Sequence, residues 1–253
     1  MNPLLELARC LKHRLDMTVH PWGRQSRRLL TEWKDSQRGK RCFILGNGPS
    51  LRRTDLSKLR GEYTFGLNRV YLLFPELGFH TTYFVAVNHL VIRQCAAEIL
   101  DLPMPKFLPW GSRRDLPGVT ADTVFFNASC PGRGFSPDLR RPLWPGATVT
   151  YVALQIAYHL GFEQVILIGV DHNFVTQGPA GQAVTSQGDD PNHFSPHYFG
   201  KGFRWELPDL ETSEIAYRLA RQAYERAGRQ VLDATLGGKL TVFPKVDYDS
   251  LFV

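Results

Sequence analysis

One apolar run that ends in a glycine turn, residues 41–51 (RCFILGNGPSL), constrains the fold of this chain more than any other stretch. Residues 42–45 are continuously apolar, and the turn stops this run just before a helical pattern begins. That order predicts a buried parallel strand, a tight turn and a helix start. Glycines let backbone N–H groups approach a ligand, and a helix N-terminus attracts negative charge. The turn therefore predicts an anion site made by Gly46, Asn47, Gly48, Pro49 and Ser50.

This turn differs from the two most familiar nucleotide-binding turns. An NAD-binding turn has a third glycine close by and an acidic residue about 20 positions further on. This chain has Leu51 and Asn68 at those places. A P-loop ends in lysine followed by serine or threonine, and the turn has no such lysine. We therefore expect a nucleotide or phosphorylated-ligand site of another type.

Apolar runs and helical patterns alternate along the rest of the chain. Further strands are expected at residues 63–67, 82–87, 106–110, 123–127, 164–169 and 230–232. Helical segments are expected at residues 51–59, 70–77, 89–101, 148–160 and 210–228, and an irregular basic loop at 130–146. This alternation predicts an α/β fold: a Rossmann-like open, mainly parallel sheet with helices on both faces. We expect one such nucleotide-binding domain over residues 41–253.

Polar residues follow several of the expected strands. Asn68 and Asn88 end the second and third strands, and Gly169 and Asp171 end the strand at 164–169. Because ligands of an open parallel sheet bind at the carboxyl ends of its strands, we expect these residues to line one crevice with the glycine turn. An asparagine amide both donates and accepts, which suits a pyrimidine edge or a ribose hydroxyl. The simpler alternative is that each asparagine only shapes a turn.

Residues 174–208 show no periodicity and are too long for an ordinary connection, so they predict a lid. The candidate acids, bases and charge stabilisers are His193, His197 and Lys201 in the lid, and Asp171 and His172 just before it. A structural role is the alternative for each histidine. The H-x-x-x-H spacing lies in a loop that does not set both rings on one face, so no transition-metal ligands are assigned.

The first 40 residues predict a basic helical extension. Two helices are expected, the second at residues 25–34, with Pro21, Trp22 and Gly23 as the break between them. Leucines at positions 4, 7, 11 and 15 have helical spacing beside many basic residues, and the whole chain carries a net charge of +6. Such a helix commonly packs on its own domain. The alternative is that it lies on an anionic membrane surface.

The remaining composition narrows the class of protein. No apolar run approaches the roughly 18 residues of a membrane span, and the N-terminus lacks the pattern of a signal peptide. We therefore expect a cytoplasmic protein, with peripheral contact at the inner membrane face as the alternative. Cys10, Cys42, Cys95 and Cys130 show no metal-binding spacing and are expected to be free thiols. We expect no nucleic-acid partner and leave the oligomeric state open.

Several stretches taken together resemble a known group of enzymes. They are GNGPSL (46–51), FGLNRVYL (65–72), FVAVNHL (84–90), TVTYVALQIAYHLGFEQVILIGVD (148–171) and HYFG (197–200). They are similar to the bacterial sialyltransferases that use CMP-sialic acid. The wider group includes motility-accessory-factor flagellin glycosyltransferases and archaeal 6-hydroxymethylpterin pyrophosphokinases. The similarity spans roughly residues 41–240.

The resemblance implies roles for individual residues. In these sialyltransferases the glycine turn and the strand-end asparagines hold the cytidine nucleotide, a Thr/Ser-rich helix start holds the phosphate or carboxylate of the donor, and a histidine deprotonates the acceptor. By motif, the helix start is Thr148 and the histidine is His197. This chain has Lys201 where the family has a second histidine, and Asn173 where it has a tyrosine. Lys201, Arg204 or His172 is then expected to stabilise the developing charge.

The resemblance implies a glycosyltransferase that moves a sugar from its CMP-activated form to a surface-glycan or protein acceptor. The sugar is expected to be sialic-acid-like or another 2-keto acid sugar, and the lid is expected to exclude water. One alternative is a diphosphokinase that uses ATP and Mg²⁺, the metal being held by Asp171 and by Asp189 or Asp190. Another is a non-catalytic nucleotide-binding module. No cofactor is predicted for the glycosyltransferase.

Overall fold

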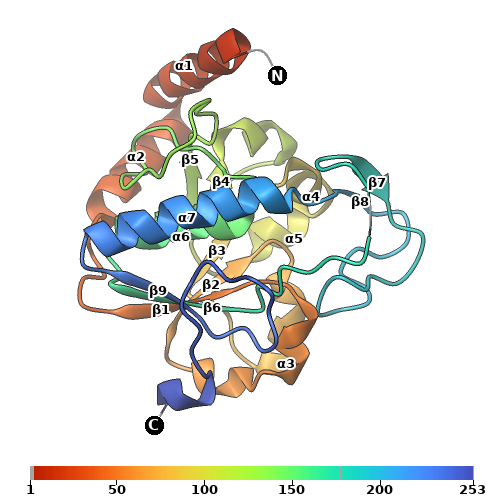
Figure 1. Cartoon of the computed structure of the whole chain (residues 1–253). Helices are drawn as coiled ribbons and strands as arrows, with labels where there is room; N and C mark the ends of the chain where they lie inside the picture. The colour runs from red at the N-terminus through yellow and green to blue at the C-terminus, as the bar shows by residue number, and fades with distance from the viewer. Residues whose placement is uncertain (1–2, 177, 253) are drawn as a thin grey trace.

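A parallel sheet organises the computed structural model, which describes residues 3–176 and 178–252. Its strand order is β5-β4-β3-β2-β1-β6-β9, and every neighbouring pair is parallel (Figure 1). The strands are β1 (Arg41–Leu45), β2 (Tyr63–Leu67), β3 (Tyr83–Val85), β4 (Lys106–Pro109), β5 (Thr123–Phe126), β6 (Gln164–Ile168) and β9 (Gln230–Asp233). The predicted Rossmann-like α/β fold is confirmed.

Strand β1 lies inside the sheet, between β2 and β6. Its side chains alternate between the two faces: Cys42 and Ile44 belong to one hydrophobic cluster, and Phe43 and Leu45 to the other. All four side chains are fully buried. A strand covered on both faces needs apolar residues at every position, which explains the unbroken run in the sequence.

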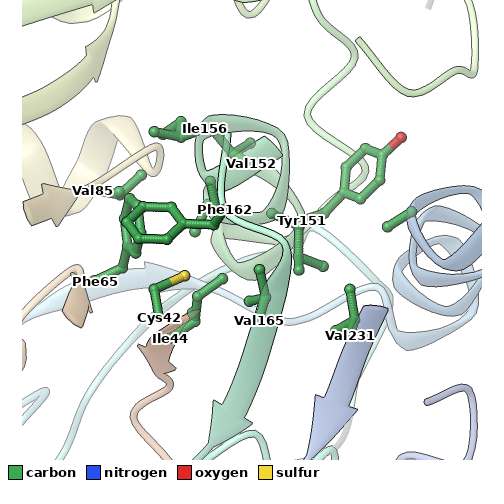
Figure 2. Packing of buried hydrophobic residues seen from close by; sticks show 14 of the residues in the cluster. Cys42, Ile44, Phe65, Val85, Tyr151, Val152, Ile156, Phe162, Val165 and Val231 are labelled. Atoms are coloured by element: carbon green, nitrogen blue, oxygen red, sulfur yellow. The ribbon is translucent and has the colours of Figure 1, made fainter. Parts of the chain in front are cut away.

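One face of the sheet is covered by three helices: α2 (Pro21–Trp33), α6 (Val149–Leu160) and α7 (Leu210–Arg226). Figure 2 shows Val152 and Ile156 of α6 next to Phe65 and Val85 of the sheet. Helix α6 is buried almost all round because α7 packs on it from outside. Its Tyr151 is fully buried, and the hydroxyl donates to the Gly134 carbonyl at 2.9 Å.

Short helical segments and the lid cover the other face. The segments are η1 (Pro49–Arg53), η2 (Leu56–Leu59), η3 (Val70–Leu73), α3 (Phe74–Leu77), α4 (His89–Gln94), α5 (Ala96–Asp101), η4 (Trp110–Asp115) and η5 (Asp249–Phe252). The helix predicted at 51–59 is broken because the Asp55 carboxylate accepts the Ser57 N–H and starts a new turn. The helix predicted at 89–101 is interrupted at Cys95, whose φ of −119° is not helical.

The N-terminal helices differ from the prediction in two ways. Helix α1 (Pro3–Val19) ends just before His20, and α2 begins at Pro21, so the break predicted at residues 21–23 is wrong. Proline suits the first position of a helix because its missing N–H needs no partner there, and the His20 ring caps the helix by accepting the Trp22 N–H. The leucines of α1 were expected to pack on the domain, which is the more common arrangement for such a helix, but they are exposed.

Helix α2 protects the edge of the sheet. β5 is one of the two edge strands of the sheet, and its Phe125 N–H donates to the Ser26 hydroxyl of α2 at 2.9 Å. Ser26 is fully buried and donates in turn to the Trp22 carbonyl. An edge strand with free N–H groups can pair with other chains, so this side-chain contact blocks one such group.

The segment 174–208 is more ordered than its sequence suggested. It contains a short antiparallel pair, β7 (Ala183–Thr185) and β8 (Arg204–Glu206), too short to give a visible alternation. Trp205 of β8 and the lid residues Tyr198 and Phe199 are buried in the hydrophobic cluster on this face of the sheet. We keep the name lid for residues 174–176 and 178–208.

A buried histidine joins α2, α6 and the basic loop. His159 Nε2 lies 2.8 Å from the Leu30 carbonyl oxygen, and Nδ1 accepts the Leu139 N–H at 3.4 Å. Burial lowers the pKa of His159, although the Leu30 hydrogen bond and the nearby Asp138 carboxylate act in the opposite direction. His159 is therefore neutral in the folded protein, because Nδ1 already accepts a hydrogen bond and has no room for a proton.

This histidine should make the fold sensitive to mild acid. The pKa of His159 is lower in the folded than in the unfolded protein. Its contribution to the free energy of unfolding is therefore complete above the unfolded pKa of about 6.5 and is lost as the pH falls below that value. The loss reaches about 1.4 kcal/mol per pH unit. Urea unfolding of wild type and His159→Gln, at about pH 7.5 and about pH 5.5, should show the difference between the two proteins shrinking in acid. A difference independent of pH would contradict this assignment.

Candidate functional site

The glycine turn after β1 packs directly on the end of β6. The Gly46 N–H donates to the Ile168 carbonyl at 2.8 Å, and the Gly48 N–H donates to the Gly169 carbonyl at 2.9 Å. A Cβ added to Gly46 would lie 2.2 Å from the Gly169 oxygen, and one added to Gly48 would lie 2.9 Å from the same atom. Close backbone packing, at the place where the strand order reverses, therefore requires both glycines.

The same turn holds the Asp171 carboxylate. Its Oδ1 accepts the Ser50 N–H at 3.1 Å, and its Oδ2 accepts the Ser50 hydroxyl at 2.7 Å. The N–H groups of Gly46, Gly48 and Ser50, expected to meet a phosphate, thus already have acceptors within the protein. The next segment, η1, is a 3₁₀ helix of five residues rather than a longer α-helix. Nucleotide contact by residues 46–50 stays a prediction, and so does a catalytic role for Asp171.

A pocket of about 730 Å³ opens at the carboxyl ends of β2 to β5. Asn68, Asn88, Thr148 and His193, all predicted site residues, line it. The other predicted site residues are outside its lining: Gly46, Asn47, Gly48, Pro49, Ser50, Gly169, Asp171, His172, His197 and Lys201. Asn68 and Asn88 thus meet at one pocket at the carboxyl ends of the strands, as expected, whereas the glycine turn expected beside them is outside its lining.

Asn68 carries an unpartnered amide oxygen. Its backbone is left-handed with φ +49°, a conformation that asparagine tolerates better than most residues, and its N–H donates to Val85 at 2.9 Å. The Oδ1 atom is buried and has no hydrogen-bond partner among the described residues, and the same holds for Asn47 Oδ1. A buried acceptor without a donor costs free energy that a ligand N–H would recover.

Asn88, unlike Asn68, has hydrogen-bond partners for its amide oxygen. Its Oδ1 caps α4 by accepting the N–H groups of Leu90 and Val91, and its Nδ2 donates to Glu206 of β8 at 3.2 Å. Both ends of the amide are thus engaged inside the protein. Asn88 holds the lid against the end of β3 while one side of it faces the pocket.

His193 is the lid histidine that lines the pocket. Its Nδ1 lies 2.7 Å from Oδ2 of Asp190, which is buried and accepts the Asn192 N–H through Oδ1. The ring also stacks on Tyr198, with centroids 4.0 Å apart and planes inclined by 8°. Asp190 therefore fixes Nδ1 as the donor. Nε2, with no hydrogen-bond partner in the described part of the chain, is left to accept a proton.

Contacts with the segments that follow β1 and β2 hold this histidine's segment in place. The Phe194 N–H donates to the Asn47 carbonyl at 2.8 Å, and Arg52 donates to the Phe194 carbonyl. The Arg69 N–H donates to the Tyr198 hydroxyl at 3.2 Å. Burial raises the pKa of Tyr198, so this hydroxyl stays protonated. The lid is thus anchored at the ends of two central strands.

The other candidate acids and bases lie elsewhere. His197 and Lys201 are exposed on the outer side of the lid. His172 has a left-handed backbone, with φ +53°, and its Nε2 lies 3.1 Å from Glu214 Oε1 of α7. The structure therefore separates the lid histidines that the sequence grouped together.

Helix α1 forms one wall of the pocket, which the sequence did not indicate. Glu6, Arg9 and His13 line it from this helix. The His13 ring lies 3.3 Å from the Ser129 hydroxyl, and burial followed by the charge of Arg113 lowers the pKa of His13. In the sequence, the only sign of this wall was the polar side of the amphipathic pattern of this helix.

The four cysteines are free thiols as predicted. Cys10, Cys42 and Cys95 are buried, and Cys130, which lines the pocket, is half-buried.

The carboxylates named for a Mg²⁺ site have separate surroundings. Asp171 is bound to Ser50, Asp190 is bound to His193, and Asp189 is exposed. Within residues 3–176 and 178–252, no group of three or more His, Cys, Asp or Glu side chains is arranged to hold a metal ion.

No protein-family model matches this chain, and no curated protein matches its sequence. Among solved structures, the MAf glycosyltransferase from Magnetospirillum magneticum AMB-1 has a similar fold, with a TM-score of 0.53. The two share 17% sequence identity, and the match covers 90% of this chain and 38% of the other. At the level of the fold, this likeness agrees with the resemblance to the motility-accessory-factor group.

Replacing Gly46 tests whether the turn is a packing junction. Gly46→Ala puts a methyl group against a backbone carbonyl, and the unfolding free energy should fall by about 1–3 kcal/mol or more. Gly118→Ala is the matched control, because its Cβ meets nothing within 4 Å and the change should be within about 0.5 kcal/mol. Urea unfolding measures both. Equal stability of the two variants would show that the junction is not tightly packed.

Proposed function

We propose that this protein is a glycosyltransferase that moves a sialic-acid-like or other 2-keto acid sugar from its CMP-activated form to a glycan or protein acceptor. The observation that carries the proposal is the pocket at the strand ends, which is lined both by His193, whose Nδ1 is paired with Asp190, and by Asn68, whose amide oxygen is unpartnered among the described residues. A base and a polar acceptor meet in one space large enough for a small ligand. The resemblance of the strand-end motifs to CMP-sialic-acid enzymes supports the choice of nucleotide.

The nucleotide fits the pocket by its hydrogen bonding. The Asn68 oxygen needs a donor, and cytosine offers its exocyclic amino group. Thr148, at the start of α6, already accepts the Thr150 N–H with its hydroxyl. The donor phosphate or carboxylate would meet this helix start, where the helix dipole favours negative charge. Arg9 on the α1 wall adds a positive charge to the same pocket.

His193 is the proposed general base. Its Nε2 takes the proton of the acceptor hydroxyl as that oxygen bonds to the anomeric carbon of the donor. The bond between this carbon and the phosphate oxygen breaks, and CMP leaves with the electron pair. Asp190 holds the ring and stabilises the imidazolium that forms, because its buried carboxylate stays hydrogen-bonded to Nδ1. The buried aromatic residues of the lid keep water from the donor.

Ligand binding tests the nucleotide directly. CMP at about 100 times its dissociation constant should add about 2.7 kcal/mol to stability, seen as a rise in melting temperature. Asn68→Gly removes the amide and keeps the left-handed backbone, so CMP affinity should fall about fivefold to tenfold. Asp35→Gly, at another left-handed position with φ +58°, is the matched control and should bind CMP normally. A shift with ATP and Mg²⁺ but none with CMP would instead favour the diphosphokinase.

Turnover tests the base. His193→Asn should lower kcat by about 100-fold to 10,000-fold with little change in CMP affinity, because proton transfer is lost while the pocket remains. His197→Asn provides the comparison, since the family motif points to His197 whereas the structure places that side chain on the outer surface. The assay follows CMP release from a CMP-activated sugar in the presence of an acceptor. If His197→Asn is the inactive variant, the base implied by the resemblance is right and ours is wrong.

A further inference from the structure

Helix α1 carries a row of exposed aliphatic side chains. Leu7, Leu11, Leu15 and Val19 recur at every fourth residue and are 47%, 49%, 68% and 69% exposed. We call these four residues the apolar ridge. Leu4 and Leu5 on the same helix are also largely exposed. A regular row on one helix face differs from the scattered apolar residues of an ordinary surface, and it indicates a binding partner.

The ridge is exposed although α1 is firmly attached. Asn127 donates to the Cys10 carbonyl at 3.1 Å, and the Trp110 ring N–H donates to the Asp16 carboxylate at 3.2 Å. Arg113 forms an ion pair with the same carboxylate. Figure 1 shows α1 at one end of the molecule, next to α2 and with its far side open. The polar side of α1 thus faces inward and the apolar ridge faces outward.

Positive charge surrounds the ridge. Lys12 and Arg14 are exposed and, at 100° per residue, lie on either side of it. Arg14 also lines a second pocket, of about 580 Å³, between α1, α2 and the basic loop. Arg27, Arg140 and Arg141 line the same pocket, and of these Arg140 is paired with Asp138. An aliphatic row flanked by cations complements a surface with an apolar interior and anionic head groups.

We infer that α1 docks this protein on an anionic membrane surface, with the apolar ridge in the acyl boundary and Lys12, Arg14 and Arg27 at the lipid phosphates. No helix in the described part of the chain is long and apolar enough to cross a membrane. A helix of this kind lies in the plane of the interface, its apolar face buried by about 5–10 Å. The anionic lipid is preferred over a protein partner because cations border the ridge on both sides.

Docking also determines where the proposed catalytic pocket lies relative to the membrane. Glu6, Arg9 and His13 line that pocket from the inner side of α1. A helix bound to lipid would therefore hold this wall of the pocket beside the bilayer. This consequence, which rests on the proposed function, assigns the acceptor to the membrane surface.

Vesicle sedimentation tests the docking with the full chain. Wild type should sediment with vesicles of phosphatidylcholine mixed with phosphatidylglycerol, and much less with phosphatidylcholine alone or at high salt. Leu11→Glu combined with Leu15→Glu should lower the partition coefficient at least about tenfold. Lys12→Gln and Arg14→Gln should each lower it about fivefold.

Two control variants match these changes. Val175→Glu introduces a carboxylate at an exposed aliphatic residue of the lid, and Arg226→Gln removes an exposed cation at the end of α7. Both should bind vesicles like wild type. Wild-type protein that stays in the supernatant would overturn the inference, and so would equal losses in the control variants.

Light scattering addresses the competing occupant, a second copy of the chain. A wild-type dimer without vesicle binding, which becomes a monomer in the double leucine variant, would also overturn the inference. A melting temperature equal to wild type shows that the double variant is folded. CMP binding is measured separately in solution: if vesicles bind and CMP does not, the docking stands and the proposed function fails.

Discussion

The backbone junction between β1 and β6 determines where this fold has room for a ligand. In an open parallel sheet the crevice forms where the strand order reverses, which here is between these two strands. Gly46 and Gly48 bring the turn so close that its N–H groups bond to the end of β6, and Ser50 takes the Asp171 carboxylate. Many of the N–H groups in that crevice are therefore already hydrogen-bonded to other parts of the protein. The described pocket lies to one side, over the ends of β2 to β5.

The sequence predicted the central strands well and the helices of one face poorly, for a physical reason. A strand buried on both faces must be apolar throughout, so β1 and β6 stand out in the sequence. The segments over the second face are only four to six residues long, some of them started by a local side chain such as Asp55, and a pattern over ten residues does not resolve them. Their boundaries depend on individual hydrogen bonds. The β7–β8 pair was missed because three residues are too few to alternate visibly.

The candidate pocket was partly predictable, because the parallel sheet brings the carboxyl ends of its strands to one edge. Asn68 and Asn88 each follow a parallel strand, so their meeting at the carboxyl ends of the sheet was expected, and the structure shows that these two strands are adjacent. Choosing between His193 and His197 was beyond the sequence, since both lie in one loop. The difference arises from Asp190, which is buried and turns His193 toward the pocket. Burial of a loop carboxylate depends on contacts with distant strands, which local spacing does not encode.

Helix α1 shows why an amphipathic pattern does not by itself tell which side faces the protein. Its leucine spacing predicted a helix correctly, yet the polar side is the one that packs. That orientation is stable because the inward polar groups have partners: Asp16 accepts from Trp110, and the Cys10 carbonyl accepts from Asn127. Because α1 is attached to the domain through satisfied polar contacts, its apolar ridge is available to contact another apolar surface. In the proposed docking, hydrogen bonds on the inner side and hydrophobic burial on the outer side would let α1 serve both as a pocket wall and as a surface anchor.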